Sequence, residues 1–306
     1  MNFSFTDEQE QLRQEARSFL ARKPEPQWSE LAELGWLGVS ISEALGGAGL
    51  GFLEEAVLFE ELGRALYAGP YFATVGLALP ALGEEQLARV ASGEERWSAE
   101  IDGLVPDLAT VDWVVTEAGA ARAEGETLST MDETRQLGRL ADGDRTPLAG
   151  SLDRSRTLAA LACEAVGVAQ QALDLAVEYV KDRQQFGRPI GVYQAVSHRL
   201  ADTYVETELA RSLAYWAAWC VAEGDEQARI AAAAAKAFAS EAAVAACERA
   251  IQAHGGIGFT WEHVLHRYYK RAQWIEAFWG FPAALRAEVA DWAMEGARDG
   301  VPVRVA

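Results

Sequence analysis

The sequence predicts a mostly α-helical protein with a small β insert, arranged as an N-terminal helical domain, a middle β domain and a C-terminal four-helix bundle. Three observations predict this fold class. Apolar residues recur at three- and four-residue spacing at both ends of the chain, the middle carries short apolar runs between turn-rich stretches, and the later helices are long and rich in alanine. We therefore place the three domains at residues 1–95, 96–150 and 151–306.

The first domain is predicted to be helical. Its expected helices cover residues 6–19, 28–34, 52–65 and 77–91. Thr6, followed three residues later by Gln9, forms the pattern of a capping box that begins the first helix. The glycines of residues 35–51 prevent a long helix and predict a tight, irregular connection. The helical period places Glu60 and Glu61 on a polar face.

The middle and last domains differ in their periodicity. Short apolar runs predict strands at residues 113–116 and 128–131, in a segment of about fifty residues that suffices for a small sheet but not for a barrel. After residue 150 the helical period returns. The expected helices cover residues 151–183, 192–222, 225–254 and 282–294. Long helices with so much alanine pack closely in bundles.

The composition of the chain limits the classes of function that it can have. Of the 306 residues 50% are hydrophobic and 24% charged, which is typical of a soluble globular protein. We expect no membrane-spanning run and no secretory signal, and hence a cytoplasmic location. The net charge of −19 argues against nucleic acid and anionic membranes as partners. The cysteines Cys163, Cys220 and Cys247 have no metal-type spacing, so we expect no metal site.

The string RQQFGRPIGVYQ at residues 183–194 joins two predicted helices. Arg183 is suited to pair with a phosphate, Gln185 and Gln194 to hydrogen-bond a ribose or an adenine, and Phe186 to stack on a ring. Taken alone, the string favours a plain turn between helices over a binding site.

The string QAHGGIGF at residues 252–259 follows a second long helix. Its glycines allow a ligand to approach the backbone closely and expose amide donors, which suits a pyrophosphate. Alone it is a weak signal, because glycines commonly end helices and a single histidine, here His254, is more often structural. The chain shows no GxGxxG after a strand, so a Rossmann site is not supported.

Together and in this order, the two strings resemble the signature of the acyl-CoA dehydrogenase family. The resemblance spans nearly the whole chain: FTDEQEQLRQEARSFL and GWLGVSISEALGGAGLG match the family's first helix and Gly-rich connection, and EYVKDRQQFGRPIGVYQAVSHRLAD and AIQAHGGIGFTWEHVLHRYYKRA match its later motifs. It implies an oxidoreductase that desaturates an acyl-CoA thioester between its α and β carbons. It also implies dimers or tetramers in which one subunit holds the adenine end of its neighbour's FAD.

The resemblance assigns FAD contacts residue by residue. The matching positions are Arg183, Gln184, Gln185, Phe186, Tyr193, Gln194, Gln252, Ala253, His254, Gly255 and Gly256. The chain is therefore expected to hold the adenosine diphosphate half of an FAD across a subunit interface. A CoA ester is anionic, so its site must concentrate positive charge locally against the net charge of −19.

The catalytic base departs from the family pattern. Trp279 stands where the family has its usual glutamate, and an indole offers only an N–H donor. Phe281 replaces the threonine that follows. Some members carry the glutamate on the first bundle helix instead, but residues 151–161 contain none. Glu164 is a weak candidate base, with a structural or salt-bridged role as the alternative, and Glu276 is a poorer candidate.

The middle domain is truncated relative to the family. Thr116 and Glu117 keep the start of a flavin-contacting string, but the Gly-Ser-Asp turn that should follow is missing. A flavin ring needs a wall that excludes water. We expect this insert not to provide one.

The chain lacks the base and the flavin wall but keeps the motifs for the adenine side of FAD. This combination predicts a subunit of a heteromeric enzyme. The chain resembles the shorter subunit of the α2β2 acyl-CoA dehydrogenases of steroid-degrading actinobacteria, which act on sterol side-chain CoA esters. The expected partners are a fuller-length acyl-CoA dehydrogenase chain, the acyl-CoA substrate and an electron acceptor. Two alternatives remain: a self-sufficient homomeric enzyme that uses Glu164, and a flavin-free structural subunit.

Overall fold

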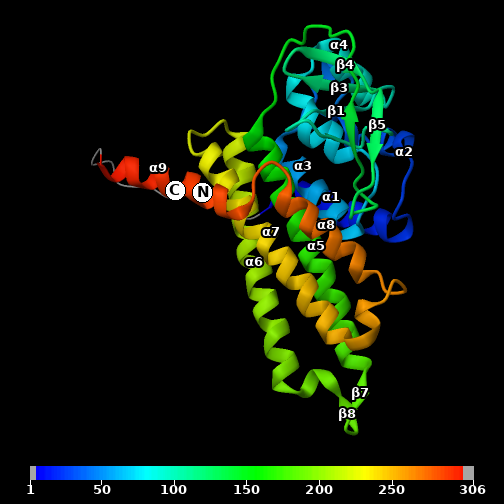
Figure 1. Ribbon diagram of the computed structural model, residues 1–306, viewed down its shortest axis with the longest axis vertical. Helices are drawn as coiled ribbons and strands as arrows, with labels where there is room; N and C mark the ends of the chain where they lie inside the picture. Colours follow the sequence, from blue (N-terminus) through cyan, green and yellow to red (C-terminus); the bar gives the residue numbers. More distant parts are fainter. Residues whose placement is uncertain (1–4, 299–306) are drawn as a thin grey trace.

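The computed structural model of the protein describes residues 5–298, and Figure 1 shows their arrangement. The strands of the β insert and helix α4 lie at one end of the long axis. Three long helices run toward the opposite end, where a small β hairpin forms the tip of the molecule. The last helix projects sideways from the body. The structure is mostly helical, as predicted, with a small amount of β structure.

The N-terminal helices are α1 (Asp7–Arg22), α2 (Trp28–Glu33), α3 (Phe52–Ala65) and α4 (Glu84–Ala91). The predicted capping box at α1 is confirmed, since the Gln9 amide donates to Thr6 Oγ1 at 3.2 Å and the Thr6 amide donates back to Gln9 Oε1. Between α2 and α3 the Gly-rich connection contains two short 3₁₀ turns. The sequence predicted this irregular segment.

The prediction of one helix over residues 77–91 is confirmed only for its second part, which is α4. The chain instead forms a π-helix, Phe72–Ala78, then a 3₁₀ turn, Leu79–Ala81, and begins α4 only after Gly83. Pro80 explains the break, because its ring lacks the amide hydrogen that a continuous helix requires.

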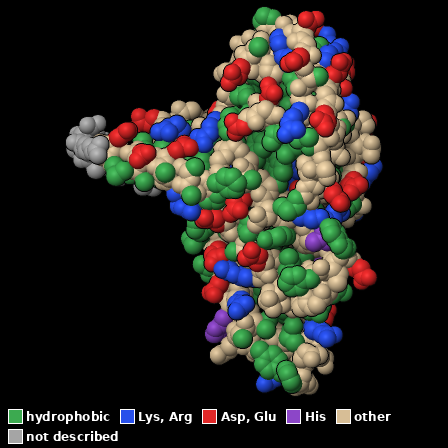
Figure 2. All heavy atoms as spheres, viewed as in Figure 1, with side chains coloured by type: hydrophobic (Ala, Val, Ile, Leu, Met, Phe, Trp, Pro, Cys, Tyr) green, Lys and Arg blue, Asp and Glu red, His purple; other side chains and the backbone are tan. Residues whose placement is uncertain are grey.

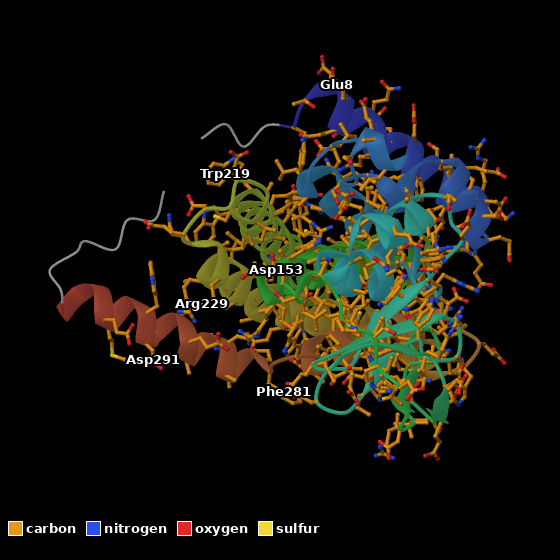
Figure 3. The ribbon with its side chains drawn as sticks, turned by 90° about the horizontal axis from the view of Figure 1, so that it is seen from above. Glu8, Asp153, Trp219, Arg229, Phe281 and Asp291 are labelled. Carbon is orange, nitrogen blue, oxygen red and sulfur yellow. The ribbon has the colours of Figure 1, made fainter. Side chains whose placement is uncertain are left out.

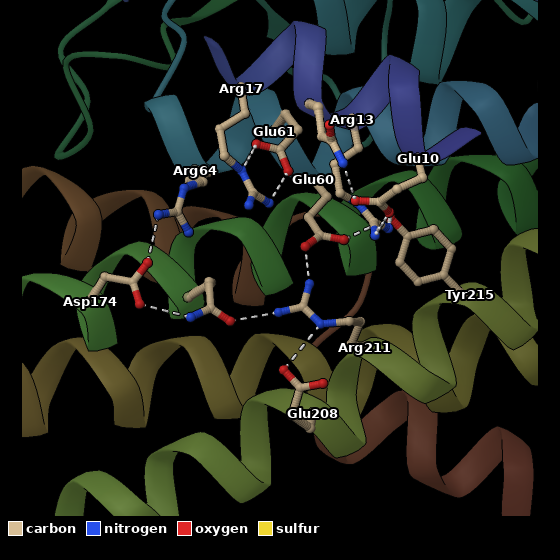
Figure 4. Close-up of polar contacts among 12 residues, drawn as sticks. Glu10, Arg13, Arg17, Glu60, Glu61, Arg64, Asp174, Glu208, Arg211 and Tyr215 are labelled. Atoms are coloured by element: carbon tan, nitrogen blue, oxygen red, sulfur yellow. Dashed lines mark hydrogen bonds and ion pairs between the residues drawn. The ribbon is translucent and has the colours of Figure 1, made fainter. Parts of the chain in front are cut away.

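Glu60 and Glu61 do not face solvent, which corrects the polar face predicted for α3. Their exposed fractions are only 3% and 1%. Glu60 pairs with Arg211 and accepts a hydrogen bond from Tyr215, and Glu61 pairs with Arg17 at 2.7 Å. Figure 4 shows this network joining α1, α3 and α6 (Gln194–Ala222). Buried carboxylates need such partners, so the polar face of α3 is an interface between helices.

The β insert forms two three-stranded sheets, ordered β1-β3-β4 and β2-β6-β5. The strands are β1 (Trp97–Ala99), β2 (Val105–Pro106), β3 (Trp113–Thr116), β4 (Gly119–Arg122), β5 (Gly125–Leu128) and β6 (Leu137–Leu140). The strand predicted at residues 113–116 is confirmed as β3. The prediction of a strand at residues 128–131 is wrong, because β5 ends at Leu128, which pairs with Leu137 of β6. The chain then turns inward and buries Asp132 and Arg135.

The bundle consists of α5 (Arg154–Asp182), α6, α7 (Ala228–His254) and α8 (Leu265–Ala277), followed by α9 (Pro282–Arg298). Buried alanines along α5 and α7 allow these two helices to approach closely. By length and composition alone, the spans Arg154–Asp182 and Ala228–Phe259 could cross a membrane, contrary to our expectation. In both, 72% of the apolar window is buried inside the protein, as in core helices.

Candidate functional site

The predicted RQQFG string forms the hairpin at the tip of the bundle. Strands β7 (Gln184–Gln185) and β8 (Arg188–Pro189) pair, with the turn residues Phe186 and Gly187 in the left-handed region at φ +53° and +79°. The ring of Phe186 is 92% exposed and meets the ring of Tyr193 edge-on at 6.2 Å. Figure 2 shows hydrophobic side chains at this end of the molecule. An exposed aromatic ring here is available to a ligand or to another chain.

The glycines after α7 divide into two kinds. A Cβ added to Gly255 or Gly256 would meet no described atom within 4 Å, so these two face open space. At Gly258 a Cβ would lie 2.5 Å from the Ile251 carbonyl oxygen, so this glycine is required for packing. Gly255 has φ +63°, where glycine is favoured. The open pair therefore leaves room for a ligand to approach the backbone.

A cavity of about 720 Å³ lies beside the hairpin, and we name it the tip cavity. Its lining includes Arg183 at the end of α5, His254 at the end of α7, and Gly256. The structure therefore brings together three of the predicted FAD contacts from two separate motifs. Five other predicted contacts lie exposed outside this lining: Gln184, Gln185, Phe186, Gln194 and Gln252. Ala253 and Tyr193 are half-buried, and Gly255 borders the cavity residue Gly256.

Among the lining residues that sequence reasoning missed are the two rings of Tyr179 and His263. The ring of His254 stacks on Tyr179 at 4.2 Å and lies 4.3 Å from the ring of His263. His254 Nδ1 lies 2.8 Å from the Ala250 carbonyl oxygen, and burial lowers the pKa of His254. A signal for Tyr179 was available, since it precedes Arg183 by one helical turn and shares its face.

The charge of the tip cavity is mixed. Glu178 and Asp182 line it next to Arg183. The local concentration of positive charge that we expected for an anionic ligand is therefore not supplied by these residues alone. The exposed Arg183 guanidinium, the open backbone at Gly255 and Gly256 and the free face of Phe186 fit one half of a dinucleotide.

A second cavity, of about 540 Å³, lies under the turn between α8 and α9, and we name it the turn cavity. Trp279 lines it together with Thr116 and Glu117 of the β insert and with the link that leads into α5. These are residues that the sequence placed around a flavin ring and its base. Thr116 Oγ1 donates to the Gly119 carbonyl oxygen at 2.8 Å, so this hydroxyl is engaged within its own turn.

The rest of the turn cavity differs from expectation. Glu100 and Asp102 also line it, and sequence reasoning did not single them out. Phe281 is 59% exposed at the start of α9, where Figure 3 shows it at the edge of the molecule, outside this lining. Phe278, which precedes Trp279 in the sequence, forms a buried aromatic cluster with Phe72 and Trp274, with ring centroids 4.7–5.7 Å apart.

Glu164 lies in neither cavity. It is 2% exposed, and its Oε1 accepts hydrogen bonds from Arg135 and Arg271, each at 2.5 Å. Arg271 also donates to Asp132 at 2.8 Å. Because two guanidinium groups hold this carboxylate, the geometry favours the salt-bridged role over that of a base. Asp132 and Arg135 come from the β insert, so the network ties the insert to α5 and α8.

Comparison with known proteins decides the family. Two family models match, described as "Acyl-CoA dehydrogenase, N-terminal domain" over residues 6–94 and "Acyl-CoA dehydrogenase, C-terminal domain" over residues 147–294. The acyl-CoA dehydrogenase IpdE2 of Mycobacterium tuberculosis is 39% identical over 260 residues, which cover 80% of this chain and 79% of that protein. The chain belongs to the acyl-CoA dehydrogenase family. The predicted fold, oxidoreductase class and FAD cofactor are thereby confirmed.

Other acyl-CoA dehydrogenases are similar over most of the chain. FadE34 of Mycobacterium tuberculosis is 36% identical, with 83% of this chain matched to 40% of that protein. Among solved structures, a variant of the "Tcur3481-Tcur3483 steroid ACAD" has a TM-score of 0.81 at 28% identity and covers 95% of this chain and 99% of its own. The ChsE4-ChsE5 complex of Mycobacterium tuberculosis shares the fold, with a TM-score of 0.81 at 24% identity over 96% and 99% of the two chains.

Proposed function

We propose that this chain is the subunit without the catalytic base in a heteromeric FAD-dependent acyl-CoA dehydrogenase. One observation carries the proposal: Trp279, which has no group able to accept a proton, lines the turn cavity at the position expected for the base. The pairing of Glu164 with two buried arginines supports the same reading. The partner is a fuller-length acyl-CoA dehydrogenase chain that supplies the glutamate, the flavin wall and the acyl pocket, in an α2β2 assembly.

The part that this chain plays is to bind and orient. Arg183 binds a phosphate of the cofactor, and the open space beside Gly255 and Gly256 lets the cofactor approach the backbone. The exposed ring of Phe186 stacks against the cofactor or the partner. FAD, when bound, supplies the acceptor for the hydride that leaves the β carbon. The partner's glutamate takes the α proton. The mixed charge of the tip cavity supports a site completed by a second chain.

The substrate in this proposal is the CoA thioester of a sterol side chain. Its support is the likeness to a solved steroid ACAD, at 28% identity over 95% of this chain. The named pairs of chains in that structure and in the ChsE4-ChsE5 complex support a partner for this chain as well.

The cofactor contacts can be tested on the complex. Arg183→Ala is expected to weaken FAD retention by about 1–3 kcal/mol, because a phosphate would lose its charged partner. Gln252→Ala is expected to weaken FAD retention by a similar amount, because a hydrogen-bonding group would be removed. Flavin content is measured by absorbance after gel filtration. Arg139→Ala, which removes an exposed arginine of β6, is the matched control. Full flavin content in both site variants would place the adenine half elsewhere.

Glu164→Gln separates the proposal from the self-sufficient alternative. Turnover of the complex is expected to stay within a few-fold of wild type, whereas loss of a true general base costs about 10²–10⁴ in rate. Asp132→Asn is the control, since it disturbs the same network without being a candidate base. A large loss confined to Glu164→Gln, with flavin content and assembly intact, would move catalysis into this chain.

A further inference from the structure

Lys236 of α7 is fully buried, although its side chain is cationic. Its Nζ donates to the Glu276 carbonyl oxygen at 2.8 Å and to the Gly280 carbonyl oxygen. Glu276 lies in the last turn of α8, where carbonyl groups lack partners within the helix. A cation at this end also interacts favourably with the helix dipole. The two bonds join the end of α8 to the turn that leads into α9.

The turn between α8 and α9 has an unfavourable backbone. Trp279 has φ +52°, in the left-handed region that costs an ordinary residue roughly 1–2 kcal/mol. Such a conformation persists only when the surroundings enforce it. Gly280 follows at φ +130°, and a Cβ there would lie 3.2 Å from Leu285 and 3.4 Å from Arg154. The turn is therefore enclosed by α5, α7 and α9.

We propose that Lys236 is the positioning residue of this turn and holds the side chain of Trp279 in the turn cavity. Its two acceptors stand on either side of Trp279 in the sequence, so its bonds fix the backbone before and after the indole. The inference rests on the proposed function in one respect only, namely that residue 279 occupies the position of the lost catalytic base. The geometry of the lysine and the turn does not depend on it.

The charges around Lys236 make the contact sensitive to pH. Burial is the main cause that lowers the pKa of Lys236 to about 7; the Glu276 carboxylate of α8 opposes this shift and the Arg154 guanidinium of α5 adds to it. Arg154 is itself paired with Glu288 of α9 at 2.9 Å. A charged donor makes a stronger hydrogen bond than a neutral one. The two hydrogen bonds from Lys236 to the turn therefore weaken as the pH rises through neutrality.

Fluorine NMR of the full-length chain, with its ten tryptophans labelled by fluorotryptophan, reads the position of Trp279. Its resonance is assigned as the one that disappears in Trp279→Phe. In the wild type this resonance is expected to titrate with a midpoint at about pH 7. In Lys236→Met it is expected to move and to lose the titration. A loss of global stability alone would move the other tryptophans too.

Lys270→Met is the matched control. The Lys270 ammonium lies 4.2 Å from the centre of the Trp261 ring, so this variant is expected to shift the resonance of Trp261 and to leave that of Trp279 unchanged. An identical Trp279 resonance in wild type and Lys236→Met would overturn the proposal. Should Lys236→Met not fold, a wild-type resonance that stays flat from about pH 6 to about pH 9 would overturn it as well. The test uses neither flavin nor partner, so its failure leaves the proposed function standing.

Discussion

Arg271→Met is expected to lower the free energy of unfolding by about 3–5 kcal/mol, because it leaves the buried Asp132 carboxylate without its paired cation and leaves Glu164 with Arg135 alone. Arg271 is fully buried and bonds Glu164, Asp132 and the Thr134 carbonyl oxygen. The methionine fills much of the volume but offers no donor. Equilibrium urea unfolding, followed by circular dichroism, measures the change.

The matched control for Arg271→Met is Arg286→Met. Arg286 also pairs with a carboxylate, Glu241 at 2.6 Å, but both side chains are about half exposed. Exposed pairs contribute about 0–1 kcal/mol. If both variants lost less than about 1 kcal/mol, the buried network would not join the β insert to the bundle as we describe.

The stability of the chain is expected to fall as the pH rises from about 4 to about 7, through the titration of Asp107. Burial raises the pKa of Asp107 from 3.8 to about 7, against the opposite effect of Arg135 and Arg271, and with Glu164 and Asp132 adding to the rise. Between these values the folded chain keeps a proton that the unfolded chain has released, so folding weakens as the pH rises. The full shift corresponds to at most about 4 kcal/mol.

Asp107→Asn isolates this contribution. The asparagine cannot ionise, so the difference in unfolding free energy between variant and wild type is expected to change across this pH window and to level off above it. Within the described residues Asp107 Oδ2 has no hydrogen-bond partner, so the amide breaks no bond of that oxygen. Parallel pH profiles of wild type and Asp107→Asn would show that Asp107 titrates at its ordinary value.

Local features of the chain could be predicted from the sequence. The capping box at Thr6, the strand β3 and the long bundle helices follow from patterns within a few residues of one another. The two glycine-bearing motifs could also be placed, since each ends a long helix. Their meeting at the tip cavity required only that α5 and α7 pack side by side.

Features that depend on distant residues could not be predicted. The helical period identified Glu60 and Glu61 as polar, but it could not show that arginines of α1 and α6 cover them. Nor could it show that Arg135, from a loop of the β insert, reaches Glu164 of α5 across 29 residues of sequence. The hydrogen bonds from Lys236 to the turn around Trp279 are likewise tertiary contacts, and no local sequence pattern predicts them.

The central claim is that this chain offers one half of a flavin site, and the flavin content of the purified protein tests it most directly. Expressed alone, the chain is expected to carry no stoichiometric FAD and to show no visible flavin spectrum. Purified through an affinity tag from its own source cells, it is expected to bring down a fuller-length acyl-CoA dehydrogenase chain in a yellow complex with fewer flavins than subunits. A yellow homo-oligomer of this chain alone, with one FAD per subunit and turnover of an acyl-CoA, would contradict the account.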